Sequence, residues 1–165
     1  MEYFELPFIR AHKTSYLIYF CNDHDGVVTD KDQRILAFAS PEVLREYAKK
    51  KKWKIKPPLP DLDFDQIQIW IHELSPDKLD CPALYRTWNV LGDVATSVGR
   101  ADDFTGYDDH SMAVHEELFW GCNLPGSAPA DRPYQARLTQ EDLATLKDVL
   151  ETGIKIFLGN LKELA

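Results

Sequence analysis

Six carboxylates within sixteen residues are this chain's densest concentration of one chemistry. They are Asp102, Asp103, Asp108, Asp109, Glu116 and Glu117, and no Lys or Arg lies between the first and the last of them. Tyr107 and Trp120 lie within or beside the segment and have the rigid aromatic side chains that protein interfaces favour. The pattern fits a solubilising acidic loop, and it equally fits a docking surface for a basic protein. These eight residues are the predicted partner-binding site.

The sequence supports a metal site or a catalytic site less well than it supports a partner-binding site. His110 and His115 are five residues apart, whereas two ligands on one helix face need a spacing of three or four. Asp61, Asp63 and Asp65 alternate, but the Gly and the later Glu of a calcium loop are missing. No Walker, nucleophile-elbow, dinucleotide or zinc-protease motif is present. We therefore predict no catalytic residue, no metal ligand, no cofactor and no enzymatic activity.

Composition and charge point to a binding protein rather than a nucleic-acid reader. The chain has 165 residues, which suits a single domain spanning 1–165, and a net charge of −8. Residues 83–165 contain 7 Lys and Arg against 13 Asp and Glu. Contacts to phosphates need a basic surface, so direct nucleic-acid binding is disfavoured. A basic protein partner is favoured, because complementary fields speed the encounter.

Cysteine usage and the N-terminus predict a monomer in the cytoplasm. Cys21, Cys81 and Cys122 are odd in number and widely spaced, which indicates reduced thiols rather than a disulfide framework. The first residues are acidic where a signal peptide would be basic. The apolar runs are much shorter than the roughly 20 residues that cross a bilayer. No membrane contact is expected.

The elements that position these residues begin with strands. The aromatic and aliphatic run at 15–22 predicts a strand, and the turn at 23–26 leads to a hairpin with 34–38. Ser40 and Pro41 start a helix that ends in four lysines at 49–52. Residues 53–60 contain three prolines and predict a stiff connector.

Helices dominate the rest of the sequence. Their predicted positions are 65–74 with an Asp65 cap, 81–98, from a cap at Asp108 or Asp109 to Trp120, and from a Thr139 cap to about Leu161. Gly153 and Gly159 weaken the last one. Acidic and Gly/Pro-rich loops at 99–107 and 121–133 separate the helices. Trp88 should be buried and should pack towards the strand at 16–20. The predicted fold is α+β, with a small N-terminal antiparallel β-sheet packed against a mostly helical C-terminal portion.

The chain resembles the immunity proteins of bacterial toxin–immunity pairs, in particular the CdiI-type proteins of contact-dependent growth inhibition systems. The residues that carry the resemblance are those of the strand at 16–20 with 34–38, the helix at 41–48, Trp88–Ala95 and Phe119–Pro125. They cover most of the chain, from about Tyr16 to Leu158. In similar immunity proteins these elements form a small sheet backed by helices.

The resemblance implies binding rather than catalysis. An immunity protein binds the C-terminal toxin domain of a surface-delivered effector and blocks its active site, and such toxins are often nucleases with basic surfaces. Toxin-binding residues are not carried over by motif, so the site stays the acidic and aromatic set above. Two alternatives remain open: a small metal-dependent hydrolase or nuclease that uses segment 102–117, and a general protein-interaction domain.

Overall fold

The fold is α+β, as the sequence predicts, and the described residues form a mixed sheet and five α-helices. The computed structural model describes residues 1–127, 129 and 131–165; residues 128 and 130 of the predicted loop at 121–133 lie outside this range. The strands are β1 (Glu2–Arg10), β2 (Lys13–Cys21), β3 (Gly26–Val27), β4 (Ile35–Phe38), β5 (Ile55–Lys56), β6 (Leu62–Asp63) and β7 (Leu161–Leu164). The helices are α1 (Pro41–Lys50), α2 (Phe64–Glu73), α3 (Cys81–Ser97), α4 (Asp109–Gly121) and α5 (Gln140–Gly159).

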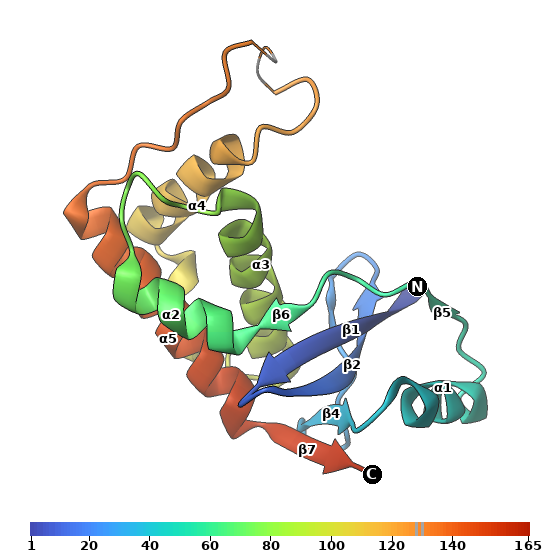
Figure 1. Cartoon of the computed structure of the whole chain (residues 1–165). Coiled ribbons are helices and arrows are strands. Elements are labelled where there is room, and N and C mark those ends of the chain that lie inside the picture. Colours follow the sequence, from blue (N-terminus) through green and yellow to red (C-terminus); the bar gives the residue numbers. More distant parts are fainter. Residues whose placement is uncertain (128, 130) are drawn as a thin grey trace.

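The sheet is mixed rather than purely antiparallel. Its order is β5-β1-β2-β4-β7, with β3 beside β2 and β6 beside β1. β1 and β2 form a long antiparallel hairpin, but β5 and β6 pair with β1 in parallel, and β7 pairs with β4 in parallel. The last strand therefore comes from the C-terminal end of the chain (Figure 1). Parallel neighbours need crossover connections, so short-range hairpin signals do not predict them.

The longest strand that the sequence did not predict is β1. It contains Pro7, and a proline counts against a strand prediction. Pro7 has no N–H to donate, which is tolerated on a side of the strand where no neighbouring strand would accept it. Pro7 pairs with Tyr16 of β2 on the other side. β5 pairs with Tyr3 and Phe4, and β6 pairs with Phe8 and Ile9, so Pro7 falls between the two short strands. The prolines that follow Lys56 divide this side of the sheet into two pieces, and the gap accommodates Pro7.

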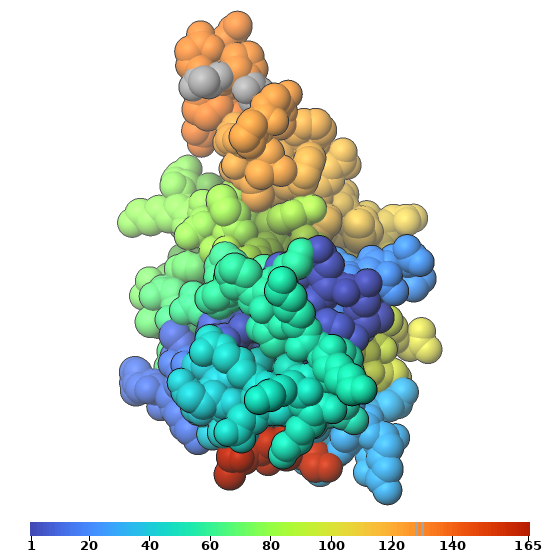
Figure 2. Space-filling view, turned by 90° about the vertical axis from the view of Figure 1, so that its right-hand side faces the viewer, coloured from blue at the N-terminus to red at the C-terminus, as the bar shows by residue number. Residues whose placement is uncertain are grey.

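Helices cover both faces of the sheet. Along β2, Leu17 and Tyr19 join the large core with α3 and α5, whereas Ile18 between them joins Leu44 and Ala48 of α1 on the other face. This alternation follows from the period of two in a strand. Arg45 of α1 donates a hydrogen bond to the buried Glu5 of β1 at 3.0 Å and ties the layers together. Figure 2 shows α1 and the segment after it, in teal, spread over this side of the molecule.

The helix starts agree with their capping residues. Ser40, Asp80 and Thr139 accept hydrogen bonds from the first turns of α1, α3 and α5. The cap of α2 is Asp63 rather than Asp65. Asp65 instead accepts from the backbone N–H groups of Ala11 and His12 at 2.8 Å, and so fixes the positive-φ turn between β1 and β2.

The last helix is uninterrupted at Gly153 because that glycine is a packing residue. A Cβ there would lie 2.8 Å from the Cβ of Leu91 on α3, so its absence lets α5 and α3 approach. The helix ends at Gly159, and the predicted helical residue Leu161 instead starts β7.

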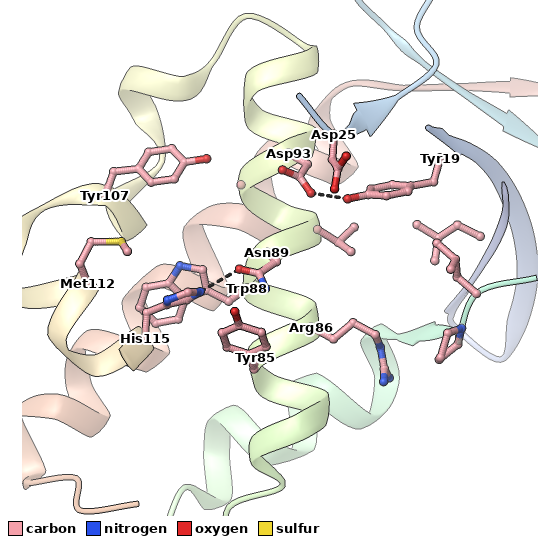
Figure 3. A pocket seen from close by; sticks show the side chains of 15 residues that line it. Tyr19, Asp25, Tyr85, Arg86, Trp88, Asn89, Asp93, Tyr107, Met112 and His115 are labelled. Atoms are coloured by element: carbon pink, nitrogen blue, oxygen red, sulfur yellow. Dashed lines mark hydrogen bonds between the residues drawn. The ribbon is translucent and has the colours of Figure 1, made fainter. Parts of the chain in front are cut away.

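Trp88 is 2% exposed, which confirms its predicted burial. Its ring packs against His115 of α4, with centroids 5.4 Å apart, and not towards Tyr19 as predicted (Figure 3).

No helix within the described residues has both the length and the apolar character required to cross a bilayer. Cys21, Cys81 and Cys122 all carry free thiols.

Candidate functional site

The predicted acidic patch is divided by the structure into carboxylates with different surroundings. Asp102 and Asp103 lie on a short 3-10 helix, η1 (Ala101–Asp103), and both are exposed. Asp103 pairs with Arg100, which lies just outside the predicted segment. The absence of cations within 102–117 therefore did not mean that every carboxylate there is unpaired.

Asp108 has a structural role at the start of α4. Its carboxylate accepts hydrogen bonds from the backbone N–H of Ser111 at 2.9 Å and from the Ser111 hydroxyl at 3.0 Å. The bond from the Ser111 backbone is the main reason that the pKa of Asp108 lies below its usual value. A residue that caps a helix cannot be reversed in charge without weakening the helix.

Glu117 also points into the structure rather than towards a partner. It accepts from the Tyr134 hydroxyl at 2.8 Å and from the backbone N–H of Arg137 at 2.9 Å. These contacts fasten the end of the long loop between α4 and α5. Five of the six predicted carboxylates are exposed, and only Glu117 is partly buried. Asp108 caps α4 and Asp103 pairs with Arg100, so the exposed carboxylates without either role are Asp102, Asp109 and Glu116.

The exposed face of α4 brings together acidic and apolar side chains. Asp109, Met112, Ala113, Glu116 and Trp120 recur at helical spacing and are all exposed, while Ser111, Val114 and Leu118 face the core. Met112 is 42% exposed and Trp120 is 37% exposed, which is unusual for such large apolar groups. We call these five exposed residues the α4 face.

A groove of about 530 Å³ runs beside this face, along the outer side of α3. Tyr85, Arg86, Asn89 and Asp93 of α3 form its floor at helical spacing, Leu6 and Tyr19 line it from the sheet, and Tyr107, Met112 and His115 line it from the other side (Figure 3). Leu59 and Pro60, which precede β6, also line it. Tyr85, Met112 and His115 also line a shallower hollow on the α4 face, so the two surfaces are continuous.

Glycine at position 92 shapes the groove. Its missing side chain leaves room for the Tyr107 hydroxyl, which lies 2.7 Å from where a Cβ would be. The Tyr107 ring packs edge-on against the buried Phe104, with centroids 5.0 Å apart, and stays 51% exposed. The predicted aromatic anchor Tyr107 is therefore held rigidly at the rim.

The carboxylate of Asp93 is partly buried in the groove. It accepts a 2.5 Å hydrogen bond from the Tyr19 hydroxyl, and Asp25 lines the same end. Burial raises the pKa of Asp93, the Tyr19 bond opposes that rise, and the negative charge of Asp25 adds to it. Burial likewise raises the pKa of Tyr19. No ion pair of Asp25 or Asp93 with a Lys, Arg or His occurs among the described residues.

The rest of the groove has a different character. His115 shares a 2.8 Å hydrogen bond with Asn89, and burial lowers the pKa of the imidazole, which keeps it neutral. Arg86 lies at the other end of the groove from Asp93. It donates a long hydrogen bond of 3.4 Å to the backbone oxygen of Asp61. The buried Nε of Arg86 has no acceptor in the described part of the chain.

Most groove residues are absent from the sequence-predicted site, which contained only Tyr107 of this set. One signal was available: Tyr85, Arg86, Asn89 and Asp93 interrupt the apolar pattern of helix 81–98 at a helical spacing. The contributions of Tyr19 and Asp25 could not be read this way, because they depend on how β2 meets α3. Nowhere in the described residues do three or more His, Cys, Asp or Glu side chains gather in a way that could hold a metal ion.

Comparison with known proteins shows the fold alone. No protein-family model and no curated protein sequence matches the chain. Among solved structures, the chain is similar to the C-terminal domain of SatS, crystallised in complex with bromine. The two share 12% sequence identity with a TM-score of 0.60, over 98% of this chain and 94% of that domain. The similarity extends over the whole sheet-and-helix arrangement.

Proposed function

We propose that this protein is an immunity protein that binds a cognate basic toxin domain and blocks its active site. The observation that carries the proposal is the α4 face, on which exposed Met112 and Trp120 alternate with the carboxylates Asp109 and Glu116. Large apolar side chains surrounded by charges of one sign are typical of an interface with a partner of opposite charge. The net charge of −8 supports the same choice of partner.

The chemistry of the partner follows from the α4 face. A basic surface, as on a nuclease that binds phosphates, would be attracted by the acidic field and would meet Met112 and Trp120 as anchors. Blocking the substrate-binding surface of such a toxin requires no catalysis by its inhibitor. The resemblance of the sequence to CdiI-type immunity proteins names the biological setting of this proposal.

The proposal predicts that a reading frame next to this protein's gene encodes a toxin domain, and the test uses that domain in purified form. Asp109→Lys with Glu116→Lys should slow association at low ionic strength by about tenfold or more, and should flatten the dependence of the rate on salt. Neither residue caps α4, so the helix should persist in circular dichroism. Asp108 is unsuitable for this experiment because it is the cap.

The matched control is Asp32→Lys with Asp148→Lys, which changes the net charge equally away from α4. Both residues are exposed. Association rates are measured by stopped-flow or surface plasmon resonance at several salt concentrations. If both double variants slow association equally, only net charge matters and the α4 face is not the interface. If the purified toxin domain is neither bound nor inhibited by the wild-type protein, the immunity function is wrong.

A further inference from the structure

The groove along α3 has complementary chemistry at its two ends. Asp25 and Asp93 occupy one end, and Arg86 occupies the other (Figure 3). Arg86 and Asp93 are seven residues apart on one face of α3, which corresponds to about 10 Å along the helix axis. Asn89 lies between them on α3, and Met112 lines the groove from the side of Tyr107 and His115. Leu6, Leu59 and Trp88 add apolar side chains to the lining. The groove therefore has an acidic end, a basic end and a mostly apolar lining.

We infer that this groove binds an extended segment of the partner protein that carries an Arg or Lys next to a large apolar residue. The inference rests on the proposed function and names the part of the partner that enters the groove. The cationic side chain would reach Asp25 and Asp93, the apolar one would contact the apolar lining, and a carbonyl or carboxylate oxygen would face Arg86. About three residues of extended chain span 10 Å, which matches the length of the groove.

Charge complementarity decides the kind of occupant. Two carboxylates face one end of the groove, and Tyr19 gives Asp93 a hydrogen bond but no positive charge. An arriving guanidinium or ammonium group would supply the missing opposite charge where solvent is partly excluded, so the attraction is stronger than at an open surface. An acidic segment would meet these carboxylates and be repelled. A wholly apolar one would leave them facing it without a partner.

The position of the groove agrees with a protein segment as its occupant. Met112 and His115 line both the groove and the hollow on the α4 face, so a partner seated on that face could extend a loop or strand into the groove without a break. The groove has a volume of about 530 Å³.

The experiment presents the whole protein to a phage-displayed library of random dodecapeptides, with no toxin present. The enriched sequences should share an Arg or Lys within three residues of Leu, Ile, Met, Phe or Trp. A synthetic peptide of the enriched sequence should bind Asp25→Asn with Asp93→Asn at least tenfold more weakly. Asp148→Asn, which removes an exposed carboxylate from α5, is the matched control and should bind like the wild type.

Each outcome has a definite meaning. If the double variant misfolds, the single variant Asp25→Asn takes its place, because Asp25 is exposed and its substitution should leave the fold intact. The inference then requires that Asp25→Asn binds the peptide more weakly than the wild type, by a smaller factor than tenfold. A library that yields no binder, binders without a cation, or binders indifferent to these variants overturns the inference. Toxin binding at wild-type affinity in the same variants would also overturn the inference about the groove. The proposed immunity function would still stand. A groove-dependent peptide with no binding of the neighbouring toxin would instead reject the proposed function alone.

Discussion

His115 makes the stability of the fold depend on pH. Its imidazole packs at a tilt against Tyr85 and Trp88, with ring centroids 4.7 and 5.4 Å away, and shares a hydrogen bond with Asn89. Burial lowers its pKa from the ordinary value of 6.5. The neutral ring is therefore part of the folded structure, whereas the unfolded chain accepts a proton readily.

We predict that this histidine makes the fold less stable in mild acid. As the pH falls below 6.5, the unfolded state gains a proton that the folded imidazole resists, so the free energy of unfolding decreases until the lowered folded pKa is reached. His115→Gln should remove that part of the decrease in urea unfolding between about pH 7 and pH 5. Substituting the exposed His24 with Gln is the control. Parallel pH profiles for wild type and His115→Gln would contradict the prediction.

At the scale of elements, two side chains, Glu117 and Asn123, hold the loop between α4 and α5. Figure 1 shows this loop projecting beyond the helices at the top of the view. Glu117 accepts hydrogen bonds from Tyr134 and Arg137, and Asn123 exchanges hydrogen bonds with the backbone of Tyr134. The bond to Glu117 is the main reason that the pKa of Tyr134 is raised.

Glu117→Gln should loosen this loop while the rest of the fold persists. Hydrogen bonds to a charged group contribute about 1.5–3 kcal/mol, so the variant should lose about 1–2 kcal/mol of stability, because the amide oxygen can still accept. Limited proteolysis should cleave the variant faster within 123–137 than the wild type. Glu116→Gln is the neighbouring control and should leave cleavage there unchanged. Equal protection in both variants would mean that Glu117 does not hold the loop.

At the scale of the whole molecule, the C-terminal strand completes the sheet. β7 joins β4 at the edge of the sheet, with Ile35 to Phe38 paired in register with Leu161 to Leu164. Lys162 forms an ion pair with Asp30 at 2.8 Å, and Arg34 donates to the backbone oxygen of Leu161 at 2.7 Å. The end of the chain is thus fastened to a hairpin that precedes it by more than a hundred residues.

Removing residues 161–165 should destabilise the whole protein rather than fray one end. Several hydrogen bonds at about 1 kcal/mol each predict a loss of about 2–4 kcal/mol. The transition in urea should shift to lower concentration with a single midpoint, as measured by fluorescence and circular dichroism together. A chain shortened by Ala165 alone serves as the reference. Unchanged unfolding of the longer truncation would show that β7 adds nothing to the fold.

Local sequence determined much of the secondary structure and the class of the fold. Capping residues and apolar periodicity located α1, α3, α4 and α5 within a few residues, because both signals act over one or two helical turns. The strand β2 and the α+β class followed from composition and element order. Exposed Asp109, Glu116 and Trp120 were also correctly placed on or beside one helix, since residues with that spacing share a face.

Only the tertiary structure decided which side chains meet. Whether a carboxylate caps a helix, fastens a loop or stays exposed depends on groups that approach from elsewhere, as Tyr134 does for Glu117 and Arg100 for Asp103. The groove brings Tyr19 to Asp93 across 74 positions of sequence, and β7 reaches β4 across an even longer separation. Such contacts form because packing brings distant apolar faces together, and no periodicity in the sequence records that pairing.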